Sequence, residues 1–165
     1  MKVDGREEFA REVALKSLDR APRSRAQLEA TLAKRDVDPD VARAVLDSLE
    51  RVGLVDDSAL AAALVRARHS ERGLVGQALK AELRRKGIDP DSATAALAQV
   101  TPEDEAASAE RLARKRLAAT AGLPRETRLR RVAAMLAGRG HPPGLAYATV
   151  CRLLAEEGQP AAADE

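Results

Sequence analysis

Apolar positions recur at helical spacing along almost the whole chain. Leu79 and Leu83 lie one turn apart and would share one face of a helix. Gly87 then predicts a left-handed helix end, since glycine adopts that backbone conformation without steric cost. Asp89 followed by Pro90 predicts the cap and the first turn of the next helix. The pattern is therefore typical of a helix, a stop and a second helix.

The same pattern occurs once before and once after this stretch. Leu28 and Leu32 lie 51 residues earlier and are followed by a second Asp-Pro-Asp sequence at the same offset. Val132 and Leu136 lie 53 residues later and are followed by an Arg-Gly pair. Internal repeats of this length indicate helical units that stack on one another.

Start and stop signals predict further helices between these stretches. Ser24 with Gln27 forms a capping-box pattern, and Thr101 before Pro102 is a second start signal. Further starts are expected at Asp38 and at Asp56 or Asp57, and breaks at Pro22, Gly53, Gly73 and Gly122–Pro124. The helices would bury an apolar stripe that includes Phe9, Val13, Ala14, Leu46, Leu49, Val52, Leu60, Val65, Val150 and Leu154.

The predicted fold class is all-α, with three tandem three-helix repeats and no strand. The repeats are expected at residues 7–54, 55–100 and 101–156, and residues 157–165 form a tail without an apolar face that is expected to be disordered. Three short helices bury little alone, so the units should share their core and stack into an elongated, slightly curved rod.

Composition supports helix-on-helix packing. Hydrophobic residues make up 45% of the chain, mostly Ala, Leu and Val, whereas aromatic residues make up 1%, namely Phe9 and Tyr147. The net charge is only +2, but acidic residues gather at 36–60 and basic ones at 66–86 and 111–131. Such basic zones are either binding surfaces or ordinary solvated helix faces.

No catalytic constellation is present in the sequence, so an enzyme and a cofactor are not expected. His69 and His141 are far apart and lack metal-ligand spacing, and His141 is expected to pack its ring at the position of the earlier Val37 and Ile88. The aspartate pairs are explained as helix caps. Cys151 has no second cysteine to pair with and is expected to be a small buried residue.

No apolar run approaches the roughly 20 residues that span a bilayer. The first eight residues are too polar for a signal peptide. A cytoplasmic monomer without a membrane contact is the resulting expectation.

Short motifs in this order resemble the RecX family, bacterial regulators of the RecA recombinase. The resemblance covers about residues 8–156. Its more specific elements are Gly-Leu-Val-Asp-Asp at 53–57 and Glu-Leu-x-x-Lys-Gly-Ile at 82–88. Two positions depart from the family, which usually has aromatic residues where this chain has Leu60 and His141. Both replacements suit a core, so they concern partner binding more than the fold.

The resemblance implies binding along the groove of the RecA–DNA filament. It also implies inhibition of RecA ATP hydrolysis and strand exchange, and hence restraint of recombination, DNA repair and the SOS response. No cofactor is implied. The residues expected to contact the filament, with DNA as a secondary partner, are Arg66, Arg68, Arg84, Arg85, Lys86, Arg114, Lys115, Arg116, Arg128 and Arg131.

Two other functions fit the same residues. The basic zones could bind nucleic acid on their own, although the scarcity of aromatics argues against base stacking. The repeats could alternatively be a scaffold for an unrelated partner.

Overall fold

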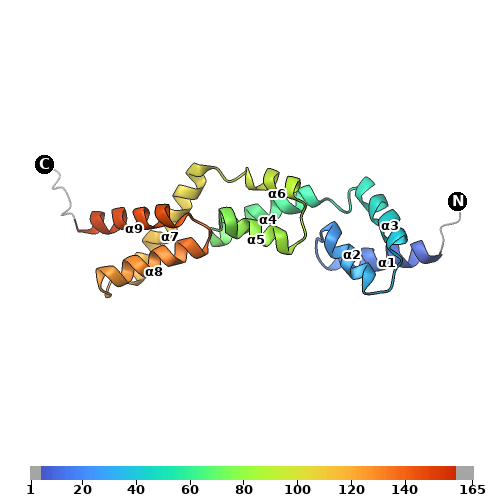
Figure 1. Ribbon diagram of the computed structural model, residues 1–165, viewed down its shortest axis with the longest axis horizontal. Helices are drawn as coiled ribbons and strands as arrows, with labels where there is room; N and C mark the ends of the chain where they lie inside the picture. Colours follow the sequence, from blue (N-terminus) through green and yellow to red (C-terminus); the bar gives the residue numbers. More distant parts are fainter. Residues whose placement is uncertain (1–4, 159–165) are drawn as a thin grey trace. The chain divides into compact units, whose positions relative to one another are not determined.

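The computed structural model describes residues 5–158, which form nine helices and no strand (Figure 1). This confirms the all-α prediction. The helices are α1 (Gly5–Arg20), α2 (Arg25–Ala33), α3 (Pro39–Arg51), α4 (Asp57–Arg72), α5 (Gly76–Arg85), α6 (Pro90–Leu97), α7 (Pro102–Ala119), α8 (Arg125–Gly138) and α9 (Pro143–Glu157).

The predicted helix starts are confirmed by capping hydrogen bonds. At α2, the backbone N–H of Gln27 donates to Ser24 Oγ at 3.1 Å, and Gln27 Oε1 accepts from the Ser24 N–H at 3.0 Å. Thr101 and Asp104 form the same reciprocal pair at α7. These bonds satisfy backbone N–H groups that have no partner inside the helix.

The aspartate caps are also present. The backbone N–H of Asp40 donates to Asp38 Oδ1 at 2.8 Å, that of Ala59 donates to Asp56 Oδ1 at 3.0 Å, and that of Ser92 donates to Asp89 Oδ2 at 2.9 Å. The carboxylates lie at the positive ends of the helix dipoles, where negative charge is favoured.

One position after the middle helix of each repeat adopts a left-handed backbone. Gly87 has φ +72°, Gly140 has φ +98°, and the corresponding Asp36 has φ +58°. The glycines confirm the predicted stop signal. Asp36 shows that the turn is retained in the first repeat without glycine.

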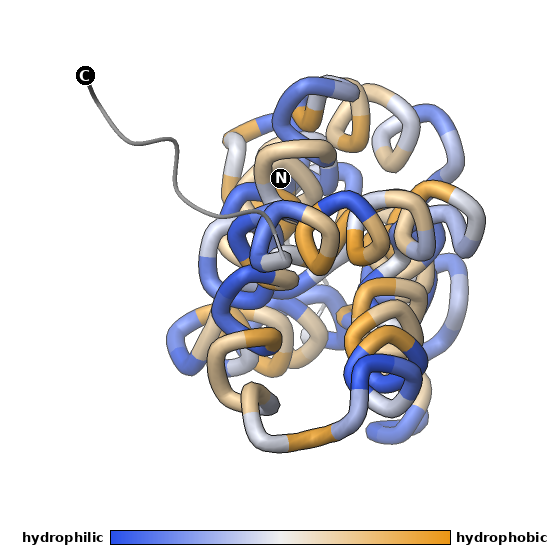
Figure 2. The backbone as a smooth tube through the Cα atoms, turned by 90° about the vertical axis from the view of Figure 1, so that its left-hand side faces the viewer, coloured by the Kyte–Doolittle hydropathy of each residue, from blue (hydrophilic) through white to orange (hydrophobic). Residues whose placement is uncertain are grey.

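Helices α1, α2 and α3, here called the first bundle, pack around one apolar core. Hydrophobic and hydrophilic segments alternate along the helical turns of the backbone (Figure 2). The core residues are Ala10, Val13, Ala14, Leu28, Leu32, Ala42, Val45, Leu46, Leu49 and Val55.

Helices α7, α8 and α9, here called the third bundle, repeat this arrangement. Its core is Ala109, Ala113, Leu117, Leu129, Val132, Leu136, Ala146, Val150, Leu153 and Leu154. Ala42, Leu46 and Leu49 of α3 correspond at constant spacing to the α9 residues Ala146, Val150 and Leu153. The repeat inferred from the leucines therefore extends to the third helix of the unit.

The chain divides into two compact units. Within the described residues, one comprises 5–65 with 80–97, and the other comprises 66–79 with 98–158. The second predicted repeat thus contributes residues to both units. Each predicted repeat range contains three helices, while the exact boundaries and the stacking into a rod stay predictions.

The predicted tail begins one residue too early. Glu157 is the last residue of α9 and belongs to the helix. Gln159–Glu165, for which disorder was predicted, lie outside the described residues.

Several residues expected inside are exposed. Phe9 is 42% exposed and Val52 is 67% exposed. The inward face of α1 is occupied by Ala10, Val13 and Ala14, which leaves Phe9 at its edge, and Val52 follows the last residue of α3. Cys151 is half-buried at the margin of the third core, not fully inside.

Candidate partner-binding surfaces

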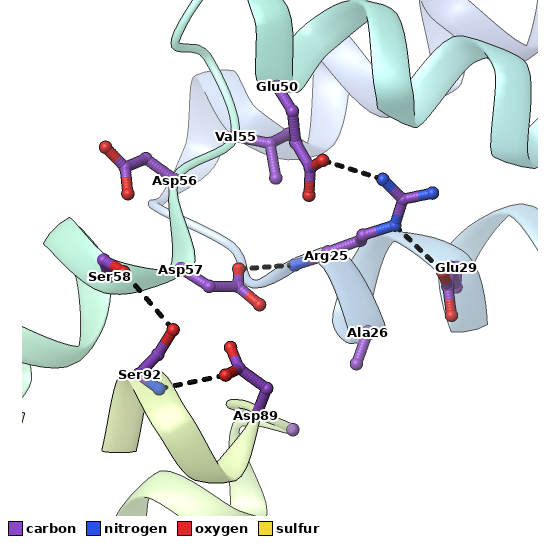
Figure 3. A pocket seen from close by; sticks show the side chains of 11 residues that line it. Arg25, Ala26, Glu29, Glu50, Val55, Asp56, Asp57, Ser58, Asp89 and Ser92 are labelled. Carbon is purple, nitrogen blue, oxygen red and sulfur yellow. Dashed lines mark hydrogen bonds and ion pairs between the residues drawn. The ribbon is translucent and has the colours of Figure 1, made fainter. Parts of the chain in front are cut away.

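An open pocket of about 530 Å³ lies at the start of α2 in the first compact unit (Figure 3). The Arg25 guanidinium there contacts Asp47 at 2.7 Å, Glu50 at 2.9 Å and Glu29 at 3.2 Å. Partial burial opposes the charge, but the carboxylates outweigh it and raise the Arg25 pKa. The guanidinium is therefore an internal counter-ion.

Asp57 connects the same pocket to the start of α4. Its Oδ1 accepts a hydrogen bond from the Arg25 backbone N–H at 2.9 Å (Figure 3). Burial raises the pKa of the Asp57 carboxyl, and the nearby charges of Asp89 and Glu50 raise it further. The hydrogen bond from the Arg25 backbone N–H acts in the opposite direction and lowers this pKa. Asp57 therefore links the first repeat to α4, whereas Asp56 caps that helix.

The central arginines were predicted to form a contact with a partner. Arg66 is exposed, and its guanidinium donates to Gln99 Oε1 at 3.2 Å. Arg68 is half-buried, and its guanidinium lies 4.0 Å from the Glu71 carboxylate. Both arginines belong to the unit that contains the third bundle.

Arg84 and Arg85 end α5, and Lys86 follows that helix, in the other compact unit. Arg84 and Arg85 are exposed, and Arg85 forms an ion pair with Glu82. Lys86 is half-buried, and its backbone carbonyl accepts a hydrogen bond from the Ser24 hydroxyl. A single surface that combines these residues with Arg66 and Arg68 stays a prediction.

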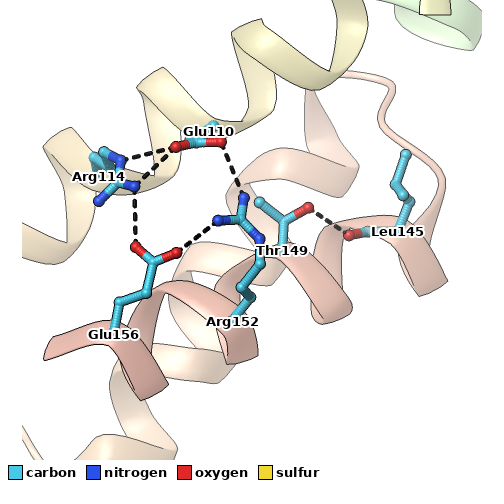
Figure 4. A network of polar contacts seen from close by, with 6 residues as sticks. All are labelled: Glu110, Arg114, Leu145, Thr149, Arg152 and Glu156. Atoms are coloured by element: carbon cyan, nitrogen blue, oxygen red, sulfur yellow. Dashed lines mark hydrogen bonds and ion pairs between the residues drawn. The ribbon is translucent and has the colours of Figure 1, made fainter. Parts of the chain in front are cut away.

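Arg114 belongs to a four-membered charge network on the third bundle (Figure 4). Its guanidinium contacts Glu110 at 2.8 Å and Glu156 at 3.0 Å, and Arg152 contacts the same carboxylates at 2.9 and 2.8 Å. Hydrogen bonds from Arg114 and Arg152 lower the Glu110 pKa. The network joins α7 to α9, so Arg114 already has partners within the bundle.

Arg128 departs from its predicted place on a partner-binding surface. The residue is 9% exposed, and its guanidinium donates to both Glu157 oxygens at 2.8 and 3.1 Å. It also donates to the Leu117 carbonyl at 2.9 Å. Because these bonds hold the guanidinium inside the third bundle, Arg128 stabilises the bundle.

Lys115, Arg116 and Arg131 are exposed, as a binding surface requires. The sequence prediction omitted other exposed cations of this bundle, namely Arg111, Arg125, Arg130 and the ion-paired Arg152. The spacing could have identified Arg111, since it lies one helical turn before Lys115 and shares the outer face of α7.

His141 is 2% exposed and packs at the position of Val37 and Ile88, as predicted. Burial lowers its pKa, the Gly73 backbone opposes this, and the nearby His69 lowers it further. His69 itself is half-buried, and its Nδ1 lies 3.1 Å from the Leu74 carbonyl oxygen. Neither ring faces a cluster of ligands, because residues 5–158 contain no group of three metal-binding side chains.

None of the helices in the described part of the chain is both long and apolar enough to cross a membrane.

Comparison with known proteins shows which proteins this chain is similar to. Residues 10–49 match the family model for the first three-helix domain of RecX, and residues 56–97 match that for the second. Regulatory protein RecX of Thermobifida fusca is 49% identical over 149 residues, which cover 90% of this chain and 80% of that protein. Regulatory protein RecX of Streptomyces coelicolor is 43% identical over 152 residues, covering 92% and 81%.

Solved structures show the same fold. The crystal structure of RecX from Lactobacillus salivarius has a TM-score of 0.82 at 20% identity, and the match covers 93% of this chain and 99% of that one. The similarity in sequence extends along nearly the whole chain and includes both of the matched three-helix domains. The chain therefore belongs to the RecX family of regulatory proteins.

Proposed function

We propose that this protein is a negative regulator of the RecA recombinase that binds the RecA–DNA filament. The observation that carries the proposal is the 49% identity to a regulatory protein RecX over 90% of the chain. The filament, rather than free RecA, is proposed because several helical units can each contact a different protomer. Such multivalent binding is tight even when each contact is weak.

The proposed contact lies at the end of α5. Arg84 is exposed and has no carboxylate partner among the described residues, so its charge is available to an acidic surface. Arg85 could exchange Glu82 for a carboxylate of the partner. Lys115, Arg116 and Arg131 of the third bundle would supply a second contact, with RecA or with DNA.

Binding along the filament groove would hinder the movements of neighbouring protomers. The expected consequences are slower ATP hydrolysis and slower strand exchange, and hence restraint of homologous recombination and of the SOS response. This action requires no catalytic residue of the regulator, and we propose a non-enzymatic, monomeric, cytoplasmic protein.

The test is RecA's DNA-dependent ATP hydrolysis during titration with this protein, with binding to the bare DNA measured in parallel. The variant Arg84→Glu/Arg85→Glu should lose inhibition, because it reverses the charge of the contact. Arg43→Glu/Arg51→Glu is the matched control, since it changes the same charge on exposed residues of the acidic α3 region. Inhibition that survives the first variant would exclude this contact.

A second candidate is autonomous binding of nucleic acid by the third bundle. It is favoured by the exposed Lys115, Arg116 and Arg131, which have no carboxylate partner among the described residues. It predicts inhibition that follows DNA coverage and a steep dependence of DNA affinity on salt. Inhibition well below one regulator per RecA, with little bare-DNA binding, would instead support the filament.

A further inference from the structure

A second open pocket, of about 480 Å³, lies on the first bundle, opposite in charge to the acidic pocket around Arg25. Residues of α1 and of α2 line it, together with the connection between them and the residues just after α2. Its ionisable lining is Lys16, Arg20, Arg23, Arg35 and Glu12. Four cations thus face one carboxylate, and that carboxylate is already paired with Lys16 at 2.8 Å.

The three arginines of this pocket have no carboxylate partner among the described residues. The Arg23 Nε is buried and has no hydrogen-bond partner there. A buried donor without an acceptor is costly, and water or a bound group can supply the acceptor. The pocket therefore offers directed donors to an anion.

The helical register brings these side chains together. Phe9, Lys16 and Arg20 follow one another at intervals that place them along one stripe of α1. Arg35 approaches from beyond the end of α2, and its guanidinium lies 5.7 Å from the centre of the Phe9 ring. Phe9, one of two aromatic residues in the chain, is thereby exposed at the edge of a cationic pocket.

We propose that this pocket binds a single-stranded nucleic acid, with its phosphates on Arg20, Arg23 and Arg35 and a base against Phe9. Guanidinium groups form paired hydrogen bonds to phosphate oxygens. The three guanidinium groups of this pocket carry more N–H donors than the oxygens of a single carboxylate ligand could accept. An exposed aromatic ring next to cations suits base stacking, which tolerates any sequence. The proposal is independent of RecA, because the site and its test require only this chain.

The test is the fluorescence anisotropy of a labelled oligothymidylate titrated with the full chain at several salt concentrations. Arg20→Gln/Arg35→Gln should weaken binding by at least about tenfold, since charged hydrogen bonds to phosphate are lost. The slope of log affinity against log salt should fall by about 1.4, since each phosphate contact on a single strand contributes about 0.7. Phe9→Leu should also weaken binding while retaining an apolar side chain.

Two matched measurements identify the ligand and the site. Arg125→Gln/Arg130→Gln removes the same charge from exposed residues of the third bundle and should change binding by less than about twofold if those residues make no phosphate contact. Pyrophosphate and polyglutamate serve as competitors, and circular dichroism confirms that each variant is folded. Weak competition by both, relative to an unlabelled oligothymidylate, supports a nucleic-acid site.

Three results would overturn the proposal. One is a larger loss in Arg125→Gln/Arg130→Gln than in the pocket variant, which would place nucleic-acid binding on the third bundle. Another is an unchanged affinity of Phe9→Leu together with strong competition by pyrophosphate, which would indicate a free phosphate ligand. Strong competition by polyglutamate would indicate an acidic protein segment.

Discussion

The first and third bundles place their apolar residues alike but use their arginines differently. In both, small residues of the first helix share the core with aliphatic residues of the second, as with Ala10 and Ala14 and with Leu28 and Leu32. In the third bundle, however, arginines of all three helices are bonded to glutamates of the bundle. In the first bundle, Arg25 is bonded to carboxylates in the same way, but Arg20 and Arg23 border a pocket and have no carboxylate partner among the described residues.

This difference distinguishes the positions that folding constrains from the positions that are available for binding. Apolar positions must recur because each unit buries the same stripe against the same neighbours. Charged positions are free to differ, since exposed ion pairs contribute little to stability. Charged side chains that have no ion-pair partner within their own unit are consequently the ones through which that unit can acquire its own function.

The turn after the middle helix gives the largest expected difference between the bundles. In the third bundle, a Cβ on Gly140 would overlap the Val75 carbonyl oxygen, and the backbone there has φ +98°. Gly140→Ala should therefore cost about 3 kcal/mol or more of unfolding free energy, measured by chemical denaturation. Gly138→Ala is the control, since open space surrounds that position and alanine favours the helix. A cost below about 1 kcal/mol would contradict the overlap.

The buried arginine of the third bundle gives the next largest effect. Arg128→Met should destabilise the protein by about 2 kcal/mol, because it removes the bonds to Glu157 and to the Leu117 carbonyl. The Arg128 guanidinium lowers the Glu157 pKa against a small effect of burial. Stability from this pair is thus complete above the ordinary glutamate pKa and is lost as the pH falls through the lowered value.

Denaturation midpoints of wild type and Arg128→Met, measured from pH 7 to pH 3, test this dependence. The difference between the two proteins should shrink toward low pH, and only the contribution of packing and of the Leu117 carbonyl bond should persist. A difference that is constant with pH would show that the ion pair contributes nothing.

The sequence predicted the helical frame but not the position of Arg128. Helix caps such as Ser24 and Asp38 depend on neighbours within three residues, and they were identified correctly. The neighbour of Arg128 is Glu157, 29 residues away on another helix. A basic residue in a basic zone was therefore assigned to a surface, and only the packing of α8 on α9 places it inside.

Phe9 illustrates the same limit. Its helical register allows either the core or its edge, and hydrophobicity alone favoured the core. The alanines of α1 lie nearer to the neighbouring helices because they are small, so the large ring is left at the edge. The pocket beside it could not be inferred from the sequence, since its lining comes from two helices and their connection.

The partly buried Arg25 should contribute more to stability than the exposed Arg114. Only 22% of the Arg25 side chain is exposed, against 53% for Arg114, and solvent screens exposed pairs. Arg25→Met should cost about 1 kcal/mol, and Arg114→Met should cost less. Thermal unfolding at low and high salt compares them, and an equal or larger effect of Arg114→Met would reverse the ranking.

Substitutions of Asp36 should give the smallest change in the free energy of unfolding. They also give the most direct comparison of the two turns. It adopts φ +58° at the position held by Gly140 in the third bundle, and a residue with a Cβ is strained in that conformation. Asp36→Gly relieves the strain but increases the freedom of the unfolded chain, so a net gain of about 0.5 kcal/mol is expected. Asp36→Ala retains the Cβ and should instead destabilise the protein. If chemical denaturation showed a loss for both variants, the aspartate side chain itself would stabilise the turn, and the first bundle would have replaced glycine by a specific interaction.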